Sequence, residues 1–339
     1  MQNFCDNAVL FTDGDLIFYY AGFYVDDGFL VVHNGVQYLL TDGRYIESAK
    51  ERASAQCYLQ SELSLDDLLD RLGVKNIGLV YGYTSAKLYE SLQSKGFTLY
   101  DYTDEHNEIS SVKSESQLAK IKKACEISEQ AFLKTLPFIK EGITELELSA
   151  ELEHNFKRLG GLVGFETIVA FGKGSSVPHY KTGNVKLEKG MPILMDFGCS
   201  YGGFLSDMTR TLFFGEPTGK FLTVYNAVKN AHLKTVNEIT SGISCKRADA
   251  IARDYLSEFG LAEYFTHSLG HGIGVKIHEY PTLNKKSETI LKNGMVFSVE
   301  PGVYLEGEFG VRIEDTVTLI DGKAVSLMTT DKELLVIKG

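Results

Sequence analysis

The sequence predicts an α+β protein of two domains, a smaller α/β domain at residues 1–108 and a larger domain at residues 109–339. A chain of 339 residues is longer than one hydrophobic core usually serves. Short strand and helix patterns alternate before residue 100, whereas longer helical patterns followed by strands come later. The polar stretch at residues 101–115 separates the two regions, and we expect it to be a linker.

The smaller domain shows strand patterns joined by turn dipeptides. In HNGVQYLL, Asn34-Gly35 separates two apolar runs, which predicts a tight hairpin because both residues tolerate a positive φ. The predicted strands cover residues 8–13, 29–35, 36–43, 76–82 and 97–103, and the predicted helices cover 45–53 and 64–73.

The larger domain begins with two helices that have clear start signals. Ser114 and Gln117 have the spacing of a capping box, and apolar side chains then recur at helical intervals. A second helix is predicted after Thr144, with Glu147 three residues later, and it ends near Gly160. Strands are predicted next, at residues 164–172, 192–198 and 207–215.

This layout occurs twice in the larger domain. Ile139–Thr144 returns as Ile239–Ser244, and each segment lies between two helical patterns. The second copy has helices at residues 220–240 and 246–260, followed by strands that include MVFSVEPG and VRIEDTVTLI. We interpret the pattern as an internal duplication, with chance similarity as the alternative.

Acid and imidazole side chains lie in short apolar stretches at Asp196, Asp207, His271, Glu300 and Glu314. Buried carboxylates are costly unless a cation or a partner neutralises them. Oxygen ligands suit ions such as Mn²⁺, and imidazole suits several transition metals. The set therefore predicts a site for two divalent metal ions.

Two hairpins explain how these acids could meet. A turn at Tyr201-Gly202 would set Asp196 opposite Asp207, and a turn around Gly307 would do the same for the two later acids. Bare carboxylates at that distance repel each other, and a divalent cation would remove the penalty.

Histidines concentrate near this set. His267, His271 and His278 fall within twelve residues, and His179 follows a Gly-Lys-Gly-Ser-Ser turn. The glycines and the missing Glu argue against a helical zinc motif, and the glycine spacing argues against a phosphate loop. Arg312 lies close before the last acid and is either a surface charge or a group that orients an acid or a substrate.

Composition excludes several other classes. A net charge of -11 argues against nucleic-acid binding, and no apolar stretch reaches membrane-spanning length. The start, MQNFCDNAVLF, lacks the features of a signal peptide, and the scattered cysteines predict free thiols in a reducing cytoplasm. Cys199 is better explained as a small residue in a hairpin than as a nucleophile.

Four stretches of the larger domain fit one known pattern: MDFGCSYGGFLSDMTRT, HSLGHGIGVKIHEYP, VEPGVYLEGEFGVRIED and VPHY. They resemble the pita-bread-fold metallopeptidases, which include Xaa-Pro aminopeptidases, Xaa-Pro dipeptidases (prolidases) and methionine aminopeptidases. LLTDGRYIESA resembles the creatinase-type N-terminal domain. The resemblance implies a curved antiparallel sheet flanked by helices, with pseudo-twofold repeats and the metals on the concave face.

The resemblance also implies a role for each ligand. Asp207 and Glu314 would bridge two divalent ions, Asp196 would complete the shell of one ion, and His271 and Glu300 would complete the other. Manganese is the expected metal, with cobalt or zinc as alternatives.

The family pattern assigns roles to further residues. Glu300 would take a proton from the attacking water and pass it to the leaving nitrogen. His278 would hydrogen-bond the substrate carbonyl, and His179 would bind substrate and shuttle protons. His267 and Arg312 would orient the polar network.

GVRIED and the N-terminal domain favour the proline-directed branch, acting on proline-containing peptides as a cytoplasmic homodimer. Thr282 stands where some dipeptidases carry an arginine for the dipeptide carboxylate, so an Xaa-Pro aminopeptidase is the main expectation. Xaa-Pro dipeptidase, methionine aminopeptidase and a non-catalytic peptide-binding relative are the alternatives. Retention of the complete ligand set argues against the last of these.

Overall fold

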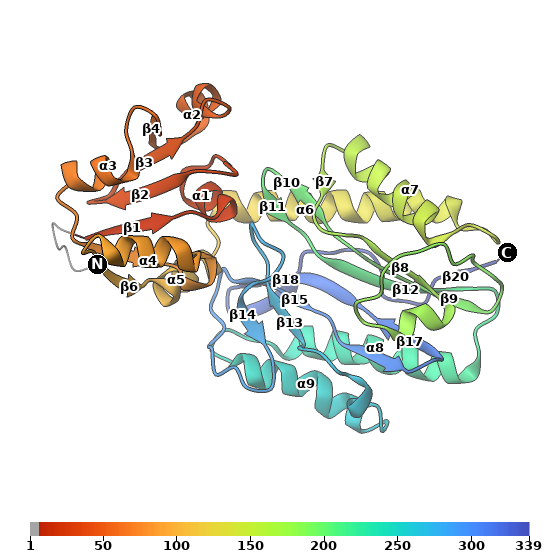
Figure 1. Cartoon of the computed structure of the whole chain (residues 1–339). Coiled ribbons are helices and arrows are strands. Elements are labelled where there is room, and N and C mark those ends of the chain that lie inside the picture. Colours follow the sequence, from red (N-terminus) through yellow and green to blue (C-terminus); the bar gives the residue numbers. More distant parts are fainter. Residues whose placement is uncertain (1–6, 339) are drawn as a thin grey trace. The chain divides into compact units, whose positions relative to one another are not determined.

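The computed structural model describes residues 7–338, so Cys5 and the first residues of MQNFCDNAVLF lie outside the described part. The chain divides into two compact units, one ending at Ile109 and the other beginning at Ser110. Figure 1 traces both units in the order of the sequence. Within residues 7–338, no helix combines the length and apolar character needed to cross a membrane.

The first unit is built on a mixed sheet with the strand order β4-β3-β2-β1-β5-β6. The hairpin between β2 and β3 turns at Asn34 (φ 50°) and Gly35 (φ 78°), as HNGVQYLL predicts. The strands are β1 (Asn7–Phe11), β2 (Phe29–His33), β3 (Val36–Thr41), β4 (Gln56–Leu59), β5 (Asn76–Leu79) and β6 (Thr98–Asp101).

The helices of this unit include two that the sequence pattern did not predict. These are α1 and α4, which are capped by the side chains of Asp13 and Ser85. The helices are α1 (Gly14–Ala21), α2 (Ile46–Arg52), α3 (Leu65–Arg71) and α4 (Ala86–Ser94), with a short 3₁₀ turn, η1 (Tyr81–Tyr83), and α5 (Thr103–Ser111) follows, with its last two residues in the second unit.

Helix α5 corrects the expected linker at residues 101–115. The Asp101 side chain accepts a hydrogen bond from Thr103 N at 2.9 Å at the start of this helix. His106, Ser110 and Ser111 are buried although they are polar. A helix with a polar buried face lacks the apolar periodicity that sequence reasoning depends on, so the segment resembled a linker.

The second unit is built on a larger sheet with the order β14-β13-β15-β18-β12-β9-β8, to which β19 and β20 add at β18 and β12. Neighbours along this order are antiparallel. The strands are β8 (Ile168–Phe171), β9 (Met191–Phe197), β12 (Met208–Phe214), β13 (Gly270–Gly272), β14 (Glu279–Leu283), β15 (Val296–Val299), β18 (Glu314–Ile320), β19 (Lys323–Ser326) and β20 (Val336–Ile337).

Two helix pairs flank this sheet, α6 with α7 on one half and α8 with α9 on the other (Figure 1). The capping boxes at Ser114 and Thr144 are both present, which confirms the predicted helix starts. The helices are α6 (Glu115–Thr135), α7 (Glu145–Arg158), α8 (Gly219–Glu238) and α9 (Cys245–Ser257), with 3₁₀ turns η2 (Leu136–Phe138), η3 (Gly172–Ser176) and η4 (Ala262–Tyr264).

The internal duplication is confirmed by contacts that recur in both halves. Gly142 N donates to Leu187 O at 2.8 Å, and Gly242 N donates to Leu291 O at 2.8 Å. The two halves meet where β12 pairs with β18 at the centre of the sheet. We call this pairing the seam.

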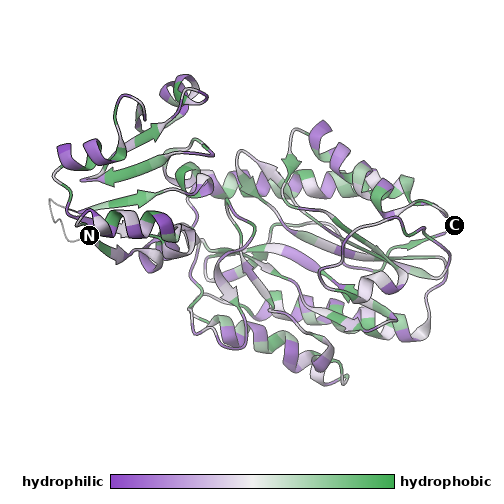
Figure 2. Cartoon of the chain, viewed as in Figure 1, coloured by the Kyte–Doolittle hydropathy of each residue, from purple (hydrophilic) through white to green (hydrophobic). Residues whose placement is uncertain are grey.

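The two seam strands mix polar and apolar residues: β12 reads MTRTLFF and β18 reads EDTVTLI, and part of β18 is coloured as hydrophilic in Figure 2. Every residue of β12 is buried. A polar side chain on such a strand must find a partner, because an unpaired polar group in the interior is costly. The seam therefore constrains the polar residues that it carries.

Candidate metal centre

The register of β9 and β12 differs from the sequence prediction by one residue at the turn. Asp196 lies opposite Thr209 rather than opposite Asp207. The turn falls at Gly202 (φ 56°) and Gly203 (φ 80°), between β10 (Cys199–Tyr201) and β11 (Phe204–Leu205). The shift moves the partner by two residues, so Asp196 and Asp207 still point to the same face as diagonal neighbours.

The small hairpin carrying this turn leaves the main sheet. Strands β10 and β11 form a separate sheet with β7 (Leu162–Val163), in the order β11-β10-β7. Gly198 lies at the departure point, where a Cβ would lie 2.1 Å from Ser206 O. Glycine permits this close approach of two backbones, so the acids stay on the main sheet while the turn projects away.

The second hairpin has the predicted register. Strand β16 (Gly302–Leu305) pairs with β17 (Phe309–Arg312) around Gly307, and Val299 lies opposite Asp315 on the adjoining strands. Continuing this register sets Glu300 opposite Glu314, as expected for a turn around Gly307.

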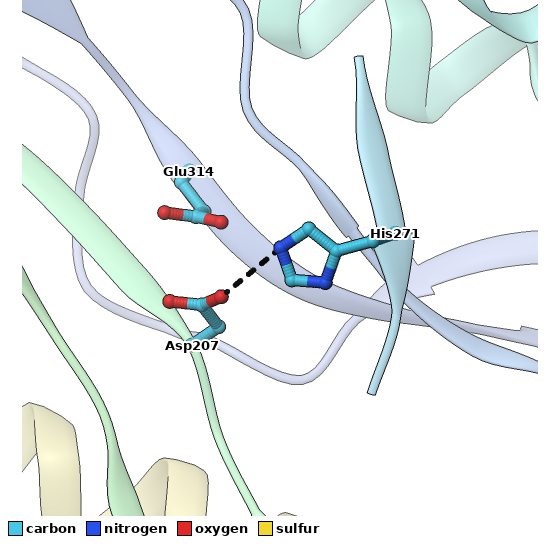
Figure 3. Close-up of side chains that lie close together, drawn as sticks. All are labelled: Asp207, His271 and Glu314. Atoms are coloured by element: carbon cyan, nitrogen blue, oxygen red, sulfur yellow. Dashed lines mark ion pairs between the residues drawn. The ribbon is translucent and has the colours of Figure 1, made fainter. Parts of the chain in front are cut away.

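Three predicted ligands converge at the seam. Asp207, His271 and Glu314 each offer a ligand atom, and these atoms lie within 4.8 Å of one another. His271 Nε2 lies 3.5 Å from Asp207 Oδ2 (Figure 3). His271 lies on β13, Glu314 on β18 and Asp207 just before β12, so the cluster depends on the folded sheet.

The other two predicted ligands adjoin this cluster. Glu300 Oε1 lies 3.3 Å from His271 Nε2 and accepts a hydrogen bond from Ser298 Oγ at 3.1 Å. Asp196 Oδ2 accepts a hydrogen bond from Arg312 Nη2 at 2.5 Å. Burial raises the pKa of Asp196, although the Arg312 charge opposes that rise. All five predicted ligands therefore lie in one region of the sheet.

The protonation of these groups reflects crowded negative charge. Burial raises the pKa of Asp207 and Glu314 well above the ordinary carboxyl range, and neighbouring acids raise it further. Burial alone would raise the pKa of Glu300, but His271 lowers it to about 2. Burial alone would lower the pKa of His271, but Glu300 and Asp207 raise it to about 9.

These residues fit a divalent cation. Asp207 Oδ1 is buried and has no hydrogen-bond partner among residues 7–338. His271 Nδ1 lies 3.2 Å from Gly272 O, and a proton on Nδ1 leaves Nε2 free to ligate. Carboxylate oxygens with one imidazole form a donor set for ions such as Mn²⁺. A cation here would replace the proton that His271 otherwise supplies.

Arg312 belongs to a buried network, so the alternative of a surface charge is wrong. Its Nε donates to Thr209 Oγ1 at 3.0 Å, and its Nη1 donates to Tyr304 OH at 2.8 Å. His267 Nε2 lies 2.8 Å from the same hydroxyl. Sequence analysis missed Tyr304, because an aromatic residue in an apolar strand is normally a core residue.

The remaining predicted histidines lie next to this region. The rings of His278 and His271 have centroids 4.2 Å apart. Desolvation and the charge of His271 lower the pKa of His278. His179 is exposed on the loop after η3, where the carbonyl of the preceding residue, Pro178, accepts from Arg312 Nη1 at 3.3 Å.

A second buried charge network lies close to the ligands on the seam and was also missed. Asp315 accepts from Arg210 Nη2 at 2.8 Å and lies 2.7 Å from Lys332 Nζ. Arg210 Nη1 also donates to the backbone carbonyl of Glu314 at 2.7 Å. His232 Nε2 lies 3.8 Å from Asp315 Oδ2, and burial lowers the pKa of His232 to about 4. In Ile-Glu-Asp-Thr, two acids are adjacent on one strand, so their side chains point to opposite faces of the sheet. This pattern is the sequence signal for a second charge network behind the ligands.

Carboxylates and an imidazole gathered at the seam of a duplicated antiparallel sheet form a candidate divalent-metal site. The sequence pattern of metallopeptidase family M24 matches residues 119–321, and that of the creatinase/prolidase N-terminal domain matches residues 3–112. The chain belongs to metallopeptidase family M24, and its fold is the pita-bread fold that its motifs predicted.

Relatives cover nearly the whole chain. It is 33% identical to the Xaa-Pro dipeptidase of Pyrococcus horikoshii, over 97% of this chain and 94% of that protein. The X-Pro aminopeptidase structure from Thermotoga maritima matches with a TM-score of 0.93 and 34% identity, over 97% of this chain and 95% of that chain. The prolidase structure from Pyrococcus furiosus matches with a TM-score of 0.90 and 31% identity, over 96% of each chain.

Proposed function

We propose that this metallopeptidase is an Xaa-Pro dipeptidase that uses two divalent metal ions. The observation that carries the proposal is the cluster of Asp207, His271 and Glu314, in a chain whose full-length relatives include Xaa-Pro dipeptidases. The sequence alone favoured an Xaa-Pro aminopeptidase acting on longer peptides. The relatives support the dipeptidase alternative better than that expectation.

The proposed metal ligands follow the positions of the side chains. Asp207 and Glu314 would be shared between two ions, with Asp196 serving one ion and His271 and Glu300 the other. When bound, the ions would polarise the scissile carbonyl and lower the pKa of a water molecule. Manganese is proposed, and cobalt and zinc are the alternatives.

The chain's own residues would move protons and hold the substrate. Glu300 would accept a proton from the attacking water and return it to the leaving nitrogen. His278 would donate a hydrogen bond to the carbonyl oxygen as charge develops there. His179 would bind substrate and shuttle protons, while His267 and Arg312 would keep the ligands oriented through Tyr304 and Asp196.

A direct test compares an Xaa-Pro dipeptide with an Xaa-Pro-Yaa tripeptide. The full chain is stripped of metal with a chelator, reloaded with Mn²⁺ and assayed on both substrates. We expect activity only after reloading and a higher kcat/KM on the dipeptide. Hydrolysis by rigorously metal-free protein would contradict the metal mechanism. A preference for the tripeptide would instead support the aminopeptidase.

One observation favours that second candidate, the Xaa-Pro aminopeptidase. Thr282 on β14 lies opposite His271 on β13, so both side chains project from the same face. A threonine there cannot form the bidentate pair with a dipeptide carboxylate that an arginine forms.

Cleavage of a Met-Ala-Ser peptide in preference to Xaa-Pro substrates would favour methionine aminopeptidase. Absence of both turnover and bound metal would favour a peptide-binding relative.

We also propose that the protein acts as a homodimer in the cytoplasm. Within residues 7–338, Cys57, Cys125, Cys199 and Cys245 are free, which is consistent with a reducing compartment. The dimer is proposed from the family resemblance alone. Light scattering on the purified full chain measures its mass, and a monomeric mass would contradict the proposal.

A further inference from the structure

One buried carboxylate holds the loop between β8 and β9. Glu145 is the first residue of α7 and has an exposed fraction of 0%. Its Oε1 accepts from Phe171 N at 2.8 Å, and its Oε2 accepts from Gly183 N at 3.0 Å. Oε2 also accepts from Tyr180 OH at 3.1 Å. A single side chain therefore holds the loop at Phe171, where the loop begins, and at Tyr180 and Gly183 further along it.

A carboxylate at this position has a high desolvation cost. Among residues 7–338, Glu145 forms no salt bridge and is bound by neutral donors, and burial raises its pKa. Burying a charge without a cation is costly unless hydrogen bonds compensate. An amide would reduce the cost of the charge but offers only one acceptor oxygen. The need for two acceptor oxygens explains why a glutamate occupies this position better than packing does.

The same loop is held at its other side by the second half of the domain. Pro178 O accepts from Arg312 Nη1 at 3.3 Å, and Ser175 Oγ accepts from Gly310 N at 2.9 Å. Gly310 permits this approach, because a Cβ there would lie 2.1 Å from Ser175 O. His179 directly follows Pro178 and precedes Tyr180, so the loop is anchored on both sides of this histidine.

The loop that carries His278 is held by a glutamate in a similar way. Glu279 Oε1 accepts from Val275 N at 2.8 Å and from Lys276 N at 2.9 Å, just before His278. Lys113 Nζ donates to Glu279 Oε2 at 2.9 Å and neutralises that charge. Each half of the domain thus fixes a histidine-bearing loop with a glutamate, and the loop of Glu279 serves as an internal reference.

We propose that Glu145 is a positioning residue that holds the loop Phe171–Gly183, and with it His179, at the metal centre. The inference rests on the substrate-binding role of His179 in the proposed function. Glu145 acts through the backbone of the loop and through Tyr180, and it touches neither metal nor substrate.

The first test measures the loop directly. In the full chain loaded with Mn²⁺, Glu145→Gln leaves one of the three donors without an acceptor. Hydrogen exchange in peptides covering residues 171–183 is expected to become about tenfold faster, because one buried donor loses its partner. Peptides covering residues 275–279 should be unchanged. Glu141→Gln, the same change at an exposed position before α7, is the matched control. Unchanged exchange in the loop would overturn the proposal.

The second test asks whether the effect runs through His179. The kcat/KM on an Xaa-Pro dipeptide is measured for Glu145→Gln, His179→Ala and the double variant. Glu145→Gln should lower kcat/KM about tenfold, and it should add little loss once His179 is gone, because coupled residues are not additive. Fully additive losses would overturn the proposal. Failure of the wild-type protein to cleave any Xaa-Pro substrate would refute the proposed function, while hydrogen exchange would still decide the role of Glu145.

A milder variant tests the same proposal if Glu145→Gln does not fold. Tyr180→Phe removes one contact of Glu145, next to His179, and keeps both backbone contacts. Because one hydrogen bond is lost, we expect hydrogen exchange in the loop to become about threefold faster and kcat/KM to fall about threefold. Wild-type exchange and wild-type kcat/KM in this variant, together with a misfolded Glu145→Gln protein, would overturn the proposal.

Discussion

Thr209 and Glu314 face each other across the seam, and the Thr209 hydroxyl donates a hydrogen bond to Glu314 Oε2 at 2.5 Å. The same hydroxyl oxygen accepts from Arg312 Nε at 3.0 Å. Its single proton is therefore directed at the carboxylate. A proposed metal ligand from one half of the domain is thus oriented by a hydroxyl from the other half.

Thr209→Val should weaken metal binding without disrupting the fold. Removing a partner that orients a ligand typically costs about 10–100-fold in metal affinity. Titration of the metal-free protein with Mn²⁺ measures the change. Thr318→Val is the matched control, because Thr318 lies on the same strand as Glu314, and its buried hydroxyl donates to Met295 O at 3.0 Å without contacting a ligand. Equal losses in the two variants would show that orientation of Glu314 is unimportant.

Asp207→Asn should abolish most activity and yet stabilise the metal-free protein. The raised pKa of Asp207 means that its charged form opposes folding, so replacing it with a neutral amide should raise the melting temperature of the metal-free protein at neutral pH. In the wild type this instability grows as pH rises above the ordinary carboxyl pKa, because the folded state holds its proton longer than the unfolded chain does. Thermal unfolding after chelation checks the prediction, with exposed Asp254→Asn as the control. A lower melting temperature would contradict it.

Metal affinity should increase as pH rises from 6 to 8. His271 has a pKa raised to about 9 by Glu300 and Asp207, so it must release a proton before Nε2 can ligate. Each proton released makes affinity change about tenfold per pH unit below that pKa. Calorimetry in buffers of different ionisation enthalpy counts the protons. Binding that is independent of pH would argue against His271 as a ligand.

His232 should make the protein sensitive to acid. The unfolded chain binds this proton near pH 6.5, whereas the folded protein binds it near pH 4, so stability is complete above pH 6.5 and falls as pH decreases toward 4. The loss amounts to roughly 3 kcal/mol at most. Denaturant unfolding at pH 7 and pH 4.5 should show a smaller loss in His232→Gln than in wild type. His154→Gln, at an exposed histidine, should behave like wild type.

Thr282→Arg should shift preference toward dipeptides. The position lies opposite His271 on the neighbouring strand, and an arginine there could form a bidentate pair with the free carboxylate of an Xaa-Pro dipeptide. We expect the ratio of kcat/KM values, dipeptide over tripeptide, to rise about tenfold, since a charge-assisted pair contributes 1.5–3 kcal/mol. Thr282→Gln controls for length without charge. An unchanged ratio would place the carboxylate elsewhere.

Sequence reasoning succeeded where local patterns determine local structure. The capping boxes at Ser114 and Thr144 and the turn at Asn34-Gly35 were predicted because each depends on residues close in sequence. The acids were found because carboxylates in apolar strands require neutralisation. Glu300 and Glu314 were placed opposite each other because their hairpin is continuous around Gly307.

The errors arose where a turn could take more than one position and where structure depends on distant contacts. Asp196 was paired with the wrong residue because a run of small residues leaves the exact turn open, and the glycines at 202 and 203 both accept a positive φ. Helix α5 was missed because its buried face is polar. Tyr304 and Arg210 could not be recognised, because their partners lie on other strands and only the folded sheet brings them together.

The seam between the two halves also suggests how such a centre could originate. A half-length ancestor would have had to self-associate about a twofold axis, and every ligand near that axis would then have occurred in duplicate. Gene fusion removes this symmetry requirement. His271 contributes an imidazole from only one half, so the two proposed cation positions would have become chemically distinct once the halves were joined in one polypeptide.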